Sequence, residues 1–123
     1  MSSLNRAIVM GNIVRDFSVK PVGDSNVANI CIATNERYKD KAGEWQEKAE
    51  FHNIVVWGKQ AENCGKYLGK GSAVLVEGSL ETRKWEDKEG NPRYTTEIKA
   101  RNVQFLGKKP TSTPAAEPPG FEL

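Results

Sequence analysis

The sequence predicts an all-β protein, a small five-stranded Greek-key barrel with one short helix between its third and fourth strands. Short runs that alternate apolar and polar residues are separated by turn signals that contain glycine. Only one segment has helical spacing. A chain of 123 residues that is 37% hydrophobic can bury one ordinary core, which favours a single domain. A fragment of a β-sandwich is the alternative.

The first half of the chain supplies three predicted strands, at residues 7–14, 27–38 and 51–57. The segments VGDSN (22–26) and DKAGE (40–44) between them are typical of turns. The third run is apolar on both faces towards its end, which indicates a strand that is covered on two sides.

A short helix is predicted within residues 58–71, because Ala61, Cys64 and Leu68 recur there at intervals of three and four. Gly69 and Gly71 are expected to end it. Residues 72–85 and 93–106 then form a long hairpin across WEDKEGNP. This order of strands and helix is that of an OB-fold. We predict that it occupies residues 1–108 and that residues 109–123, with four of the six prolines, form a flexible tail that is disordered.

Charge and cysteine content narrow the function classes. The chain has 18 lysines and arginines against 16 acids, and removing Glu117 and Glu122 of the tail leaves 18 against 14, a mildly basic domain. Two cysteines outside any CxxC pair indicate reduced thiols and a cytoplasmic protein. No run approaches the 18 apolar residues of a membrane span, so we expect no membrane partner.

Trp85 is the most informative aromatic residue, because its neighbours are charged. Side chains alternate along residues 74–85, so the apolar and charged sets fall on opposite faces: Val74, Val76 and Leu80 on one, Glu81, Arg83 and Trp85 on the other. The same alternation places Phe51 and Trp57 together, opposite His52. A core position remains the alternative interpretation, most of all for Trp57 in its apolar run.

Aromatic residues interleaved with cations favour one class of ligand. Tyr38 lies between Arg37 and Lys39, Lys59 follows Trp57, and further aromatic residues occur at Trp45 and Tyr94. Single-stranded nucleic acid offers unpaired bases to stack and phosphates to neutralise. Duplex DNA fits less well, because its bases are already stacked and no recognition helix is evident.

Enzymatic functions are not supported by the residue pattern. One histidine and two separated cysteines cannot supply a usual zinc site, so we expect no metal. The segment GKYLGKG (65–71) has the wrong spacing for a phosphate-binding loop. No acid and base pair can be named, and we expect no catalytic residue and no cofactor.

The segments VMGNIVRD, VANICIATNE, EFHNIVVWGKQAENCGKYLGKGS and GSLETRKWEDKEGNPRYTTEI together resemble the bacterial single-stranded DNA-binding proteins, over roughly residues 4 to 107. The resemblance implies an OB-fold that assembles as a homotetramer and that wraps and protects single-stranded DNA in replication, recombination and repair. It implies no cofactor. It also implies a cytoplasmic protein that associates with the nucleoid.

The resemblance also implies roles for individual residues. The family's stacking positions fall on Tyr38, Phe51, Trp57 and Trp85, and every one of these keeps an aromatic ring. Tryptophan is common in the family at the first two positions, and phenylalanine at the third. The family's phosphate contacts fall on a set of basic residues, Lys39, Lys59, Lys70, Arg83 and Lys84. His52 matches a position at the family's subunit interface.

The C-terminus departs from the family pattern. Family members end in a long linker and an acidic tip that recruits replication and repair proteins, whereas this chain ends in EPPGFEL. The departure leaves recruitment open and is compatible with a short-tailed paralogue or a plasmid or phage version. Two other functions also stay open, an RNA-binding OB-fold module and a structural adaptor whose aromatic face binds a protein.

Overall fold

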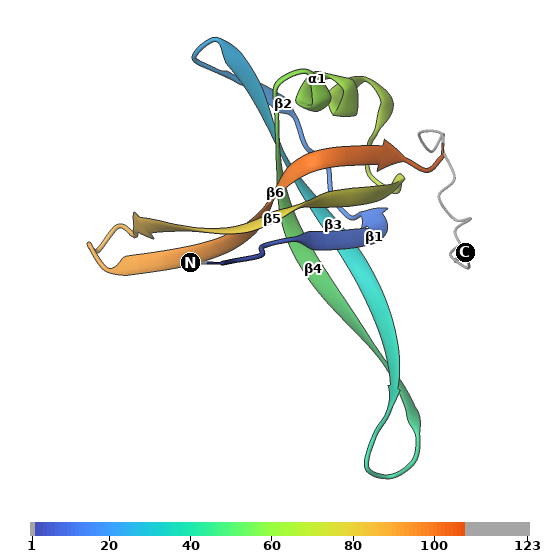
Figure 1. Ribbon diagram of the computed structural model, residues 1–123. Coiled ribbons are helices and arrows are strands. Elements are labelled where there is room, and N and C mark those ends of the chain that lie inside the picture. Colours follow the sequence, from blue (N-terminus) through green and yellow to red (C-terminus); the bar gives the residue numbers. More distant parts are fainter. Residues whose placement is uncertain (1, 108–123) are drawn as a thin grey trace.

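The computed structural model describes residues 2–107, which form six strands and one helix (Figure 1). Their bounds are β1 Ala7–Ile13, β2 Val19–Val22, β3 Ser25–Lys39, β4 Trp45–Trp57, α1 Gly58–Tyr67, β5 Ala73–Glu86 and β6 Pro92–Phe105. The predicted C-terminal tail, residues 109–123, lies outside the described residues.

Five of the strands form the predicted barrel. The sheet order is β1-β5-β6-β4-β3-β2, and pairing of Asn12 with Ala33 and of Ile13 with Ile32 joins β1 to β3 and closes the ring. The helix lies between β4 and β5, the third and fourth strands of the barrel, so the all-β fold class and the position of the helix are confirmed. The short strand β2 was not predicted; it pairs with β3 as a hairpin.

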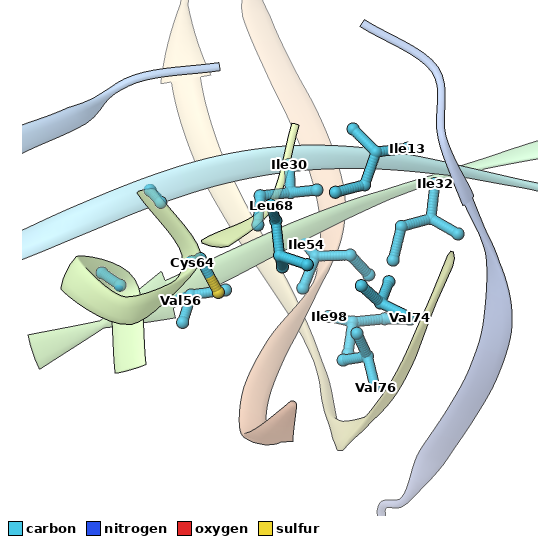
Figure 2. Close-up of a cluster of buried hydrophobic side chains, with 12 residues drawn as sticks. Ile13, Ile30, Ile32, Ile54, Val56, Cys64, Leu68, Val74, Val76 and Ile98 are labelled. Atoms are coloured by element: carbon cyan, nitrogen blue, oxygen red, sulfur yellow. The ribbon is translucent and has the colours of Figure 1, made fainter. Parts of the chain in front are cut away.

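Branched aliphatic side chains from every barrel strand fill the core, and the helix adds Ala61 and Cys64 (Figure 2). Ile54 and Val56 of β4 are fully buried, and Cys64 of α1 packs beside them. Burial raises the pKa of the Cys64 thiol to about 11, which makes it a structural apolar group rather than a nucleophile. Side chains alternate along the strands, so one face of each strand packs into this core and the other face points outward.

Two long hairpin arms leave the barrel, one made by β3 and β4 and one by β5 and β6 (Figure 1). The β3–β4 ladder is unbroken from Val27 paired with Trp57 to Lys39 paired with Trp45. The predicted third strand, residues 51–57, was therefore six residues too short. Residues 45–50 are exposed on both sides and carry no apolar alternation, so their strand conformation comes from pairing with β3 alone.

Leu80 is placed differently from its prediction as a core residue beside Val74 and Val76. It lies on their side of β5 but is 50% exposed, because β5 has already entered the arm. The change coincides with a register shift opposite Glu77 and Gly78, where β6 holds one extra residue, Arg101. A Cβ on Gly78 would collide with the Lys99 carbonyl, so the close approach of the two strands here requires glycine.

The helix satisfies the backbone groups that this bulge leaves without ladder partners. The Gln60 amide donates to the Arg101 carbonyl at 3.0 Å and accepts from the Val103 amide at 3.0 Å. Ile98 faces the core before the bulge and Val103 faces it after the bulge. The extra residue therefore reverses which residues of β6, even-numbered or odd-numbered, point into the core. The single inserted residue thus lets one strand serve both the barrel and the arm.

Both arms end in the same turn, Asp-Lys-x-Gly-x. In DKAGE (40–44), Asp40 Oδ1 accepts hydrogen bonds from the backbone amides of Ala42 and Glu44, each at 2.9 Å. In DKEGN (87–91), Asp87 Oδ1 accepts from the amides of residues 89 and 91 at the same distances. The glycine of each turn has a positive φ, 83° and 82°, which side chains with a Cβ adopt rarely. One local sequence rule therefore closes both arms.

We expect both turns to loosen in acid below the ordinary aspartate pKa of 3.8. The hydrogen bond from the Glu44 amide is the main cause of the lowered pKa of Asp40, and the bond from the Asn91 amide is the main cause for Asp87. A lowered pKa means that the turn stability is fully present above pH 3.8 and is lost as the pH falls through the folded-state value. Amide chemical shifts of Glu44 and Asn91 measured against pH check this.

The variant Asp40→Asn serves as the control for that titration. It should abolish the acid transition seen at Glu44 and leave the transition at Asn91, because the two turns are separate. Transitions of both amides at or above pH 3.8 in the unsubstituted protein would contradict the assignment.

Candidate nucleic-acid interface

Phe51 and Trp57 lie on the outer face of β4, opposite the buried Ile54 and Val56. Phe51 is 63% exposed and Trp57 is 42% exposed. The predicted alternation is confirmed, and the alternative interpretation of Trp57 as a core residue is wrong. Strand geometry separates the two residues by roughly 20 Å along β4, with Asn53 and Val55 between them on the same face.

Trp85 belongs to the same outer face, although it comes from the other arm. Strand β6 pairs with β4 at Ile98 and Ile54, both buried, so Glu97 lies on the outer side beside Asn53. On that outer side Glu97 is paired with Glu81 of β5, two positions from Arg83 and four from Trp85. Trp85 is 42% exposed, which confirms its prediction as a residue outside the core.

A hydrogen bond fixes the Trp85 ring against the neighbouring strand. Its Nε1–H donates to Thr95 Oγ1 at 2.8 Å. The polar edge of the indole is thus satisfied within the protein while part of the ring stays in contact with solvent. A base can stack on such a ring without the cost of ordering it first.

Tyr38 and Trp45 are distributed between the two sides of the β3–β4 arm. Tyr38 is paired with Gln46, one position out of phase with Phe51, so it lies on the other side of the arm. Trp45 is on the side of Phe51 and is 59% exposed. Arg37 and Lys39 lie over its ring, with 5.1 and 5.6 Å between each cation and the ring centroid. The structure thus brings Trp45 to the aromatic face and leaves Tyr38 off it.

The five predicted phosphate-binding residues are also divided. Lys39 lies on the side of the β3–β4 arm that carries Phe51. Lys59 lies on the first turn of α1, two residues after Trp57, and its Nζ is 3.7 Å from Glu62 Oε1. Arg83 lies on the aromatic side of β5. Lys84 has the opposite phase and is paired with Tyr94. The exposed Lys70 lies in a turn that is hydrogen-bonded to β1 through Gly71.

His52 lies on the inner side of β4 at the edge of the barrel, opposite in phase to Phe51, as predicted. It is half-buried, and its Nε2 is 2.9 Å from Thr34 Oγ1. This contact orients the ring within its own chain.

A shallow polar cavity of about 290 Å³ opens between the aromatic residues. Residues of β3, β4, β5 and β6 line it, and one more comes from the β1–β2 connection; they are Asn29, Ile30, Asn53, Arg83, Thr95, Glu97 and Arg15. Alternation between Phe51 and Trp57 is a signal that could have identified Asn53. Nothing in the sequence places Arg15 near β5, so its place in the cavity could be recognised only in the folded structure.

Residues 2–107 contain neither of two further kinds of site, a metal centre or a membrane-spanning helix. No group of three or more histidine, cysteine or acidic side chains in this part of the chain is arranged to hold a metal ion. None of its helices has the length and apolar character needed to cross a membrane.

Comparisons with known proteins agree with the fold and indicate one family. The single-strand binding protein family matches residues 4–106. Single-stranded DNA-binding protein 1 of Xylella fastidiosa (strain 9a5c) is 45% identical over 111 residues, which are 89% of this chain and 82% of that protein.

Two solved structures have the same fold. The structure described as the Plasmodium falciparum SSB complex with ssDNA superimposes with a TM-score of 0.79 at 34% identity, over 87% of this chain and 98% of that one. A deletion mutant of the single-stranded DNA binding protein from Thermus aquaticus gives a TM-score of 0.75 at 25% identity, over 85% of this chain and 51% of that one. On the family match and the 45% identical relative, this chain belongs to the single-strand binding protein family.

Proposed function

We propose that this protein binds single-stranded DNA with little sequence preference, and that it protects the strand during replication, recombination and repair. The observation that carries the proposal is one outer face with three exposed rings, Phe51, Trp57 and Trp85, and with cations beside them. The name of the Xylella relative and the ssDNA in the Plasmodium structure support the choice of ligand. The role is a binding role, and we assign it to the cytoplasm at the nucleoid.

The proposed mechanism divides affinity between rings and cations. Stacking of a base on an exposed ring contributes about 1–3 kcal/mol whatever the base, which explains sequence tolerance. Trp45 adds a fourth ring on this face, and Arg37 and Lys39 next to it can neutralise phosphates. Tyr38 on the other side of the arm is reached if the strand wraps around the hairpin.

We also propose assembly into a homotetramer, as in the family that the sequence resembles. Ile8 and Met10 are 56% and 43% exposed on the outer face of β1. Paired apolar side chains on a solvent-facing strand favour burial against another subunit. His52, at the edge of the barrel, remains the proposed interface residue. Recruitment of replication and repair proteins through the tail also remains a proposal.

Tryptophan fluorescence tests the proposed ligand. Oligo(dT) is expected to quench the emission, because Trp45, Trp57 and Trp85, the three tryptophans of the chain, are all at least 42% exposed and available for stacking. A duplex of the same length should quench far less, because its bases are already stacked.

Competition separates the proposal from its rivals. Poly(U) that displaces oligo(dT) at equal concentration would favour the RNA-binding alternative. Equal quenching by single strand and duplex would contradict the single-strand proposal, and no response to any nucleic acid would favour a protein-binding adaptor.

A further inference from the structure

We propose that the polar cavity between the aromatic residues receives the hydrogen-bonding edge of one nucleobase and that guanine fits it best. This inference rests on the proposed function. The cavity is bordered by outer-face positions between Phe51 and Trp57 on β4, and by the Trp85 side of the β5–β6 arm. Its volume, about 290 Å³, suits a group of the size of a single base.

The cavity is arranged for hydrogen bonding rather than for charge alone. Arg15 and Arg83 provide two positive charges and Glu97 one negative charge. Thr95 accepts the Trp85 Nε1–H bond, which links the cavity wall to the stacking ring. A base stacked near Trp85 therefore has polar partners beside its edge as well as a ring beneath its face.

Glu97 is the selective element of the cavity. Its side chain is only 13% exposed, whereas that of Arg83, its partner, is 60% exposed. Arg83 Nε and Nη2 donate to the two carboxylate oxygens at 3.2 and 3.4 Å. This bidentate contact covers the carboxylate edge that a base would need, so a base reaches both oxygens when the exposed Arg83 side chain moves aside. Glu97 then offers two parallel acceptors to the base.

Among the four DNA bases, guanine alone presents two adjacent donors, N1–H and N2–H, on its Watson–Crick edge. A carboxylate accepts both at once. The neighbouring guanine O6 then needs a donor, which a guanidinium or an amide supplies. Thymine places carbonyl oxygens on both sides of its single N3–H, and these would face the Glu97 carboxylate unfavourably.

The amides of Asn29 and Asn53 are available to such a base. They lie on the same outer side of β3 and β4, and no hydrogen bond between side chains of residues 2–107 engages either one. Arg15 likewise forms no ion pair with a carboxylate in that range. These unpaired donors and acceptors face a cavity that is open to solvent, where a ligand can replace water.

The test compares short oligo(dT) strands that carry one central dT, dG or deoxyinosine. Deoxyinosine lacks the N2 amino group and keeps the rest of the guanine edge. Measured by fluorescence titration, the dG strand is expected to bind roughly 5-fold tighter than the all-dT strand, the low end for a bidentate contact. Deoxyinosine should lose most of that advantage.

Variants assign the effect to the cavity. Glu97→Gln is expected to bring the dG and dT affinities together, and Asn53→Ala to reduce the ratio between them. Glu81→Gln is the matched control, because Glu81 is paired with Glu97 and loses the same charge but does not line the cavity. It should keep the wild-type ratio. Circular dichroism establishes that each variant is folded.

The outcomes separate the two proposals. Absence of binding to all three strands would overturn the proposed function. Equal binding of all three strands, or a dG advantage that Glu97→Gln leaves unchanged, would overturn the guanine site and leave single-strand binding intact.

Discussion

Replacement of Trp85 by alanine is expected to weaken binding to oligo(dT) by about 1–3 kcal/mol, the contribution of one stacked base. The fold should not change, because the side chain is 42% exposed and lies on the β5–β6 arm, beyond the buried part of the strand. Titration by fluorescence of the remaining two tryptophans, or by anisotropy of a labelled oligonucleotide, measures the loss.

Two controls make this result specific to stacking. Trp85→Phe keeps an aromatic face and loses only the Nε1–H bond to Thr95, so it should retain most of the affinity. The dependence of affinity on salt should be the same for wild type and Trp85→Ala, because no phosphate contact is removed. A large fall in the urea midpoint for Trp85→Ala would show instead that the ring supports the fold.

Ile54→Ala is expected to lower the free energy of unfolding by about 2–5 kcal/mol, as for other large-to-small substitutions in cores. Ile54 is fully buried and is paired with Ile30 of β3 on one side and with Ile98 of β6 on the other. It therefore lies where the antiparallel β3–β4 ladder and the parallel β4–β6 pairing meet. Urea denaturation measures the change.

Val55→Ala provides the matched comparison for Ile54→Ala. Val55 is the next residue on the same strand, but it lies on the outer face and is only half-buried. Its truncation should cost clearly less stability. A similar loss for both variants would mean that strand propensity, rather than core packing, determines the effect of substitutions in β4.

The barrel could be predicted from the sequence because each of its strands has one solvent-exposed face and one buried face. Ile54 and Val56 alternate with Phe51 and Trp57, and burial on one side alone fixes that phase. The helix was predicted in the right place, because Ala61, Cys64 and Leu68 all pack into the core, but it ends at Tyr67, and Leu68 follows it in an extended conformation. These elements depend on local pattern, which a single sequence contains.

The β3–β4 arm was predicted less well than the β5–β6 arm, whose strand ends were predicted to within one residue, because residues 45–50 are exposed on both sides. Residues 45–50 form a strand only through their partners on β3, so no apolar alternation marks them. The turn at residues 40–44 fixes the pairing of Lys39 with Trp45, and counting back from it would have put Tyr38 on the other side from Phe51. The polar cavity required the fold itself, since Arg15 and Glu97 are 82 positions apart in the chain.

The uninterrupted ladder of the β3–β4 arm has a consequence for the polymer that the protein holds. Because the ladder contains no bulge between Val27 and Lys39, the strand repeat alone sets the spacing of the rings along the arm. The bound nucleotide chain then has to bend and space its bases to match the spacing of the rings. Single strands whose bases stack strongly on one another therefore lose more of this stacking on binding than thymine tracts, whose bases stack weakly.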